Sequence, residues 1–236
     1  MDINKAFTYP FEDKQWISKL GMGAIIGLIP ILNFAWTGYM VGLLRNVSNG
    51  EAEPLPNWDN IEKKFMDGLI LAAAGLVYGL PILVLICLPM SMLIASGMLS
   101  GDSNLQDFSQ ITGVIGGALS FLLVCGFLIY GLFLTIAYPA ILVIFAREGT
   151  FASCFKFREA INLISRNSGP FFTAWGISIL AGLVVGFVAS GVTAMLGWIP
   201  CLGWIVALIV SVGTTVYTMV VYAHLFGQFS ALAARN

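Results

Sequence analysis

Charged side chains are scarce in this sequence of 236 residues. Asp, Glu, Lys and Arg make up only 10% of it, whereas 58% of the residues are hydrophobic. Soluble domains carry about 25% charged and about 45–50% apolar residues. A chain this apolar cannot enclose its surface in one water-exposed core, so the bilayer must solvate much of it. The net charge of −1 also offers no basic stripe for nucleic acid. We expect one integral membrane domain, 1–236, with the lipid bilayer and no nucleic acid as partner.

Ionisable residues are almost absent from the long apolar stretches. Across 21–44, 68–101, 111–146 and 168–234, only His224 belongs to the Asp, Glu, Lys, Arg and His types. Proton relays and ion-coupled carriers depend on such residues inside the membrane. The sequence also lacks a phosphate-binding loop, a nucleophile elbow and a zinc-protease motif. We therefore expect neither a pump nor an enzyme.

Cysteine patterns and an export signal are missing too. The four cysteines form no CxxC pair, and no histidine lies at metal-ligand spacing, so we expect no metal and no cofactor. The first 16 residues mix acids with lysines and lack a short apolar region before a cleavage site. The first apolar stretch is thus expected to remain in the mature protein.

The apolar stretches that are present predict an all-α membrane protein. Four are long enough to cross a bilayer as helices, at 68–100, 111–146, 170–196 and 204–233. The more polar segments predict an interfacial helix over 2–19, a cytoplasmic loop over 45–67 and a cytoplasmic amphipathic helix over 147–169. Lys and Arg gather in these three segments and at Arg235, while 101–110 and 197–203 have none. Because basic residues stay inside, we expect a multipass protein of the cell membrane with a cytoplasmic C-terminus.

The path of 21–44 is open between two readings. A kinked single crossing would leave the N-terminal lysines outside, whereas a re-entrant hairpin that turns at Gly27–Pro30 places every basic cluster and the N-terminus in the cytoplasm. Each arm would have about 13 residues, roughly 20 Å of helix, too short for two crossings. The run 27–34 resembles 197–204 in the pattern G-x-I-P-x-L, and the second run predicts a turn. We favour the hairpin.

Glycines at small-xxx-small spacing predict faces for close helix packing. They form four pairs, Gly23 and Gly27, Gly38 and Gly42, Gly75 and Gly79, and Gly182 and Gly186. The first two pairs would let the arms of the hairpin approach each other.

Two features of 204–233 are candidates for polar chemistry. Ser211, Thr215, Thr218 and Tyr222 share one helix face and either line a polar path or pack helices together. His224, on one face with Tyr217 and Gln228, is either a pigment or haem ligand or a hydrogen-bonded residue near the cytoplasmic end. We favour packing for the first set and hydrogen bonding for His224.

The run 27–69 carries a resemblance to a known family. Its features are the Leu-Ile-Pro turn, Gly38-Tyr39, Arg45, Gly50-Glu51, Leu55-Pro56 with Trp58-Asp59, and Gly68-Leu69. These features resemble a family of bacterial and archaeal multipass membrane proteins known as domain of unknown function 4013. The resemblance implies no activity and no site residues. It does imply that the loop with Arg45, Pro54, Pro56 and Trp58 is the distinctive surface.

We expect a non-enzymatic scaffold or accessory subunit that packs against other membrane subunits or a second copy of itself. The alternative is a small permease or channel-like protein for a small or amphipathic solute. An intramembrane enzyme ranks third.

Overall fold

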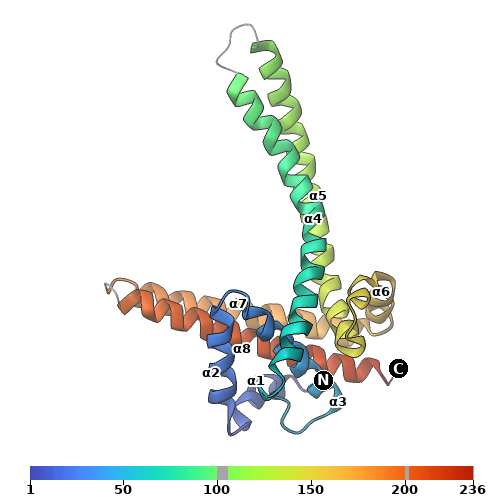
Figure 1. The fold of residues 1–236 in the computed structure, drawn as a ribbon, viewed down its shortest axis with the longest axis vertical. Helices are drawn as coiled ribbons and strands as arrows, with labels where there is room; N and C mark the ends of the chain where they lie inside the picture. Colours follow the sequence, from blue (N-terminus) through green and yellow to red (C-terminus); the bar gives the residue numbers. More distant parts are fainter. Residues whose placement is uncertain (100–105, 200–201, 236) are drawn as a thin grey trace. The chain divides into compact units, whose positions relative to one another are not determined.

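All regular structure in the described residues, 1–99, 106–199 and 202–235 of a computed structural model, is helical (Figure 1). Four helices contain stretches long and apolar enough to cross a membrane, at Ile61–Leu83, Ser109–Glu148, Ser168–Leu196 and Gly203–Ala233. The chain is therefore an all-α integral membrane protein, as the sequence predicts. The helices are α1 (Ile3–Glu12), α2 (Trp16–Leu28), α3 (Asn33–Asn49), α4 (Ile61–Leu99), α5 (Gln106–Glu148), a 3₁₀ helix η1 (Phe151–Phe155), α6 (Phe157–Arg166), α7 (Ser168–Leu196) and α8 (Leu202–Ala233).

The chain divides into two units. Unit 1 comprises Met1–Ala72 and Pro139–Asn236, and unit 2 comprises Ala73–Tyr138. Within unit 2, α4 and α5 lie side by side (Figure 1). The Tyr130 hydroxyl donates to the Tyr78 carbonyl at 3.0 Å, and Ser96 and Ser109 each donate a hydroxyl hydrogen bond to the other's carbonyl at 2.9 and 3.0 Å. Hydroxyl-to-backbone bonds thus tie the two helices together.

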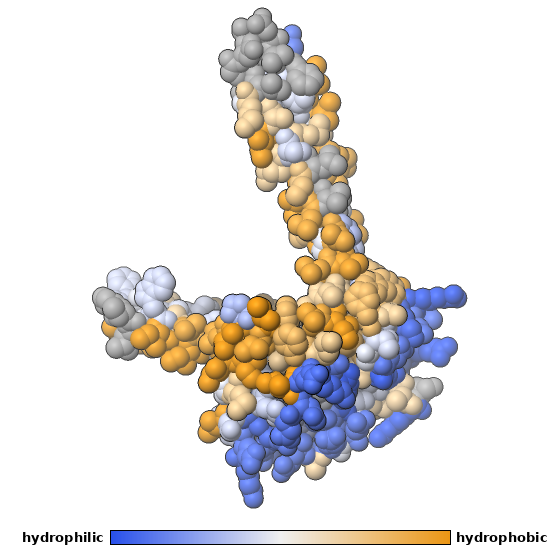
Figure 2. Space-filling view, viewed as in Figure 1, coloured by the Kyte–Doolittle hydropathy of each residue, from blue (hydrophilic) through white to orange (hydrophobic). Residues whose placement is uncertain are grey.

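Unit 1 is built around α8. Helix α7 runs beside it on one flank (Figure 1), and α3 packs on another. Gly227 makes the second contact close, because a Cβ at this position would lie 2.6 Å from Val47 Cβ. The buried Tyr39 and Leu43 of α3 pack with Val220 of α8 in the core. The outer surface of α7 and α8 is largely hydrophobic, whereas polar residues gather elsewhere on unit 1 (Figure 2).

The single interfacial helix expected over 2–19 is in fact two helices. Asp2 caps α1, with its carboxylate accepting from the Lys5 backbone N–H at 2.9 Å. The chain leaves the helical path at Asp13, and α2 begins at Trp16 and continues to Leu28. The prediction missed this break because its cause is the Asp13 side chain, which accepts from the Gln15 backbone N–H in a local turn.

The apolar stretch 21–44 is broken at the predicted proline. Helix α2 ends at Leu28, and α3 begins at Asn33 after a turn over 29–32. Ile31 in this turn has a φ of 75°, a left-handed backbone conformation that is rare for a β-branched residue. Exposed apolar side chains crowd the turn, including Leu28, Ile29, Ile31 and Leu32. Whether the turn reaches into the bilayer stays a prediction.

The loop expected over 45–67 is shorter than predicted. Helix α3 continues through Arg45 to Asn49 and is ended by Gly50, whose φ is 77°. Helix α4 begins at Ile61, so only 50–60 is loop. The helix expected over 147–169 is likewise divided, into η1 and α6, after Gly149 ends α5 with a φ of 69°. Parts of the two predicted loops without basic residues lie outside the described residues. They are 100–105, which includes the last residue of the predicted first span, and Pro200 and Cys201.

Candidate functional site

Aromatic and polar side chains in unit 1 gather around the hairpin formed by α2 and α3. A Cβ on Gly23 of α2 would lie 2.2 Å from the Trp36 ring of α3, so the glycine lets the two helices meet. The Tyr39 ring stacks on Trp36 at 5.3 Å and on Trp58 at 4.7 Å between ring centroids. This three-ring stack joins α3 to the 50–60 loop. Among the described residues, the fully buried Tyr39 hydroxyl has no hydrogen-bond partner.

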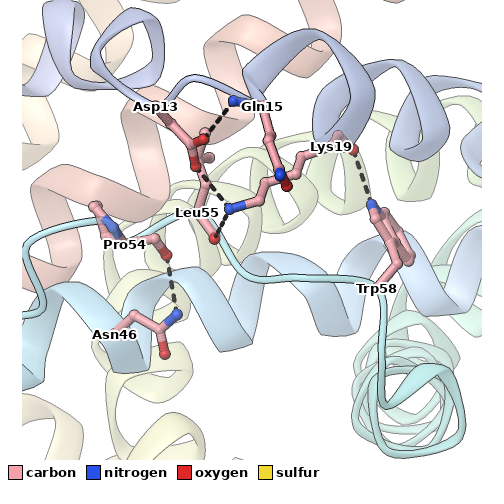
Figure 3. A network of polar contacts seen from close by, with 7 residues as sticks. All are labelled: Asp13, Gln15, Lys19, Asn46, Pro54, Leu55 and Trp58. Atoms are coloured by element: carbon pink, nitrogen blue, oxygen red, sulfur yellow. Dashed lines mark hydrogen bonds and ion pairs between the residues drawn. The ribbon is translucent and has the colours of Figure 1, made fainter.

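A buried ion pair fixes the start of α2 to the same loop (Figure 3). The Lys19 ammonium lies 2.7 Å from the Asp13 carboxylate and donates to the Leu55 carbonyl at 3.1 Å. The Trp58 indole N–H donates to the Lys19 carbonyl at 2.8 Å. Burial alone would raise the pKa of the Asp13 carboxyl, but the Lys19 ammonium and the Gln15 N–H outweigh it and lower that pKa. The Asp13 carboxyl group therefore stays ionised at neutral pH.

The residues predicted as an interaction loop do not form one exposed surface. Pro54 and Pro56 are buried, and the Pro54 carbonyl accepts from the Asn46 amide at 3.0 Å (Figure 3). Trp58 belongs to the aromatic stack. Arg45 lies on α3, where it donates to the Ala146 carbonyl at 2.7 Å and pairs with Asp67. The side chains that the loop does expose include the acidic Glu51, Glu53 and Asp59.

A pocket of about 190 Å³ lies between the hairpin and α8. Ser211 and Thr215 of the predicted stripe line it, together with Asn33 and Trp36. The Thr215 hydroxyl donates to the Ser211 carbonyl at 2.8 Å, so its oxygen lone pairs remain available as hydrogen-bond acceptors. The other half of the stripe points elsewhere, since Thr218 Cγ2 lies 3.7 Å from the Cβ position of Gly182 on α7. Tyr222 packs against Phe226, with ring centroids 4.7 Å apart.

His224 belongs to the face of α8 that receives α1. Its ring stacks on Tyr9 with centroids 4.1 Å apart, and its Nδ1 lies 3.1 Å from the Gln228 amide nitrogen. Gln228 also exchanges two hydrogen bonds with the Asp2 backbone at 2.7 and 2.8 Å. The Tyr217 hydroxyl donates to the Phe7 carbonyl at 3.3 Å. The grouping predicted from helical spacing is thus a docking face for α1. No cluster of three metal-ligating side chains occurs among the described residues.

The predicted glycine faces have different surroundings. Gly38 does not face α2, because its Cβ would lie 1.7 Å from the Lys64 carbonyl oxygen of α4. Gly42 contacts Pro56 of the loop, and Gly27 lies against Trp36. The glycines of the second hairpin arm therefore seat the start of α4 and the loop rather than the first arm. Gly75, Gly79 and Gly186 have no described atom within 4 Å of a Cβ position.

Several residues that organise this region escape sequence reasoning. Gly68 is one, since its Cβ would lie 1.7 Å from the Phe34 carbonyl oxygen. The signal that could have indicated Gly68 is its place in the run 27–69, which carries the resemblance to a known family. Asp13 and Lys19 are six residues apart and straddle a helix break, so no helical spacing indicates their pairing. Asp67, buried in α4, is likewise indicated by no pattern.

Comparison with known proteins identifies a family. The model of a family described as "Protein of unknown function (DUF4013)" matches residues 22–194. No curated protein and no solved structure matches the chain.

Proposed function

The chain belongs to the DUF4013 family of multipass membrane proteins, and from that premise we propose that it is a non-enzymatic scaffold or accessory subunit of a membrane complex. The family brings no activity with it, so the proposal rests on the surface of the helices. The open glycine face of α4 carries the proposal.

Gly75 and Gly79 lie one helical turn apart on α4 with no described atom within 4 Å of either Cβ position. The neighbouring Leu76 and Leu80 are exposed. In membranes, helices associate where small residues let their backbones approach, because lipid supplies no hydrophobic drive between helices. An open small-residue pair flanked by leucines suits the helix of a partner subunit or of a second copy.

Substitution of both glycines tests this proposal. Gly75→Leu with Gly79→Leu fills the face at two positions where a Cβ meets no described neighbour within 4 Å, so co-purification of partners in mild detergent should be lost. Gly213→Leu on α8 is the matched control, because its Cβ position is equally open but has no glycine partner one turn away. A protein that purifies without partners before any substitution refutes the proposal. Retention of partners by the double variant refutes the assignment of this face.

The second candidate, a permease-like protein, is favoured by the pocket beside Thr215. At about 190 Å³ it is smaller than the roughly 300–1,000 Å³ of drug-sized sites, which suits a small solute. Thr215→Val removes a pocket oxygen at constant shape and should reduce the flux of small amphipathic solutes into proteoliposomes. Thr214→Val, on the same helix but away from the pocket lining, is the control. Equal flux through protein-free liposomes counts against this candidate.

A further inference from the structure

A second and larger pocket, of about 620 Å³, lies in unit 1 where several helices end. Its lining comes from the last turn of α3, the first turns of α4, the end of α5 and the last part of α8. Three of these helices, α4, α5 and α8, contain candidate membrane spans, and the pocket lies at their polar ends. The pocket thus lies at the boundary between the membrane-spanning and the polar parts of unit 1.

Basic groups outnumber acidic groups in this pocket. Arg45, Lys63 and Arg147 line it, against the carboxylates of Asp67 and Glu148. Both carboxylates have cationic partners already, since Asp67 pairs with Arg45 and Glu148 lies 2.6 Å from the Lys156 ammonium. Lys63 and Arg147 have no carboxylate partner among the described residues. The charge left over is therefore positive.

Hydrogen bonds restrict the conformations of the two arginine side chains. Arg147 donates from Nη2 to the Ser230 carbonyl at 2.7 Å and from Nε to the Ser230 hydroxyl at 3.2 Å. Ser48 donates to the same Ser230 hydroxyl at 3.0 Å. Arg147 thereby keeps its Nη1 group available in a fixed position beside the hydroxyls. Prepositioned donors reduce the entropy lost when an anion binds.

We propose that this pocket binds a phosphate group, with Lys63 and Arg147 as its cationic ligands. A phosphate carries one or two negative charges and takes charge-assisted hydrogen bonds from guanidinium and ammonium donors. Basic pockets at the cytoplasmic ends of membrane helices are suited to anionic lipid headgroups. The exposed Met66 and Leu69 on the neighbouring turns of α4 offer apolar surface to acyl chains. A soluble phosphate ester shares the same headgroup chemistry.

Titration of the purified full-length protein with three probes separates these sources. The probes are dioleoyl phosphatidylglycerol, dioleoyl phosphatidylcholine and glycerol 3-phosphate, with bound molecules counted by native mass spectrometry. Phosphatidylglycerol should bind more tightly than phosphatidylcholine, which carries a compensating cation. Binding of phosphatidylglycerol alone assigns the site to an anionic lipid, whereas binding of glycerol 3-phosphate as well assigns it to phosphate esters in general.

Lys63→Gln is the decisive variant because this side chain is exposed and has no partner whose loss could disturb folding. The affinity of the Lys63→Gln variant for phosphatidylglycerol should be about fivefold lower than that of the wild type, which is the effect expected when one basic residue near an anionic surface is removed. Lys14→Gln, which removes an exposed lysine outside the pocket, should bind as the wild type does. Equal affinity for the two lipids, or equal affinity of the Lys63→Gln and Lys14→Gln variants, overturns the proposal.

Discussion

Substitution of Gly38 by alanine tests the packing of α3 against α4. The added Cβ would lie 1.7 Å from the Lys64 carbonyl oxygen and 2.8 Å from Lys64 Cα. Ordinary van der Waals contact of carbon with oxygen or carbon needs about 3.4–4 Å. Both clashing atoms belong to the backbone, so no change of rotamer relieves the overlap and the two helices must separate.

The expected loss is large for one methyl group. Overpacking in a core costs about 1–3 kcal/mol, and the backbone contact places Gly38→Ala at the upper end. Alanine returns roughly 0.5–1 kcal/mol through its better helix propensity. A net loss of about 2 kcal/mol corresponds to about 4–8 °C in melting temperature for a domain of this size.

Thermal unfolding in detergent, followed by size-exclusion chromatography of the soluble fraction, measures the effect. Gly75→Ala is the matched control, because its Cβ meets no described atom within 4 Å and should leave the melting temperature unchanged or raise it. Gly68→Ala should resemble Gly38→Ala, and the double variant should lose less than the sum, because one separation of the helices relieves both clashes. If the Gly38→Ala and Gly75→Ala variants have the same melting temperature, the close crossing of α3 and α4 is refuted.

Three further outcomes are expected. Asp13→Asn should destabilise the protein by about 3 kcal/mol at pH 7, because it leaves the buried Lys19 ammonium unpaired. Folding lowers the pKa of Asp13, so the stability that this carboxylate contributes is present above pH about 4 and is lost as the pH falls through the folded pKa. The melting temperatures of variant and wild type should therefore converge on acidification. Melting temperatures that differ by the same amount at every pH would contradict the ion pair. Trp58→Phe keeps the ring stack but loses the hydrogen bond to Lys19, which should cost about 1 kcal/mol in the same melting assay. Gly227→Ala should lower the melting temperature, since its Cβ would lie 2.6 Å from Val47 Cβ; an unchanged value would contradict the contact of α3 with α8.

The elements of the fold were largely predictable because hydrophobic length is a strong signal in a membrane protein. The four long apolar stretches correspond to the four span-length helices, and the proline at position 30 lies in the turn between α2 and α3. Helix ends were less predictable. Asn49-Gly50 reads as a loop, yet it ends a helix that continues through Arg45, because glycine provides the left-handed residue that closes α3.

The partners of individual side chains were mostly beyond reach of the sequence. Gly38 was recognised as a packing residue, but its neighbour is the Lys64 backbone of α4 rather than the other arm of the hairpin. The helical spacing correctly placed His224, Tyr217 and Gln228 on one face, and the structure shows that α1 covers this face. Such contacts depend on how helices distant in the sequence are placed, which periodicity within one helix does not encode.

The core of unit 1 joins the first and last parts of the chain, and this affects biosynthesis. Asp2, the N-cap of α1, and Tyr9 of α1 form hydrogen bonds to α8, and Val47 of α3 fills the space left by Gly227. During translation, residues 1–50 emerge long before α8 exists, so their buried face has no permanent partner until α8 has been made. Until then, the ribosome-bound intermediate must keep that apolar surface in lipid or on an insertase, and a chain truncated before α8 would present it to the cell's quality-control proteases.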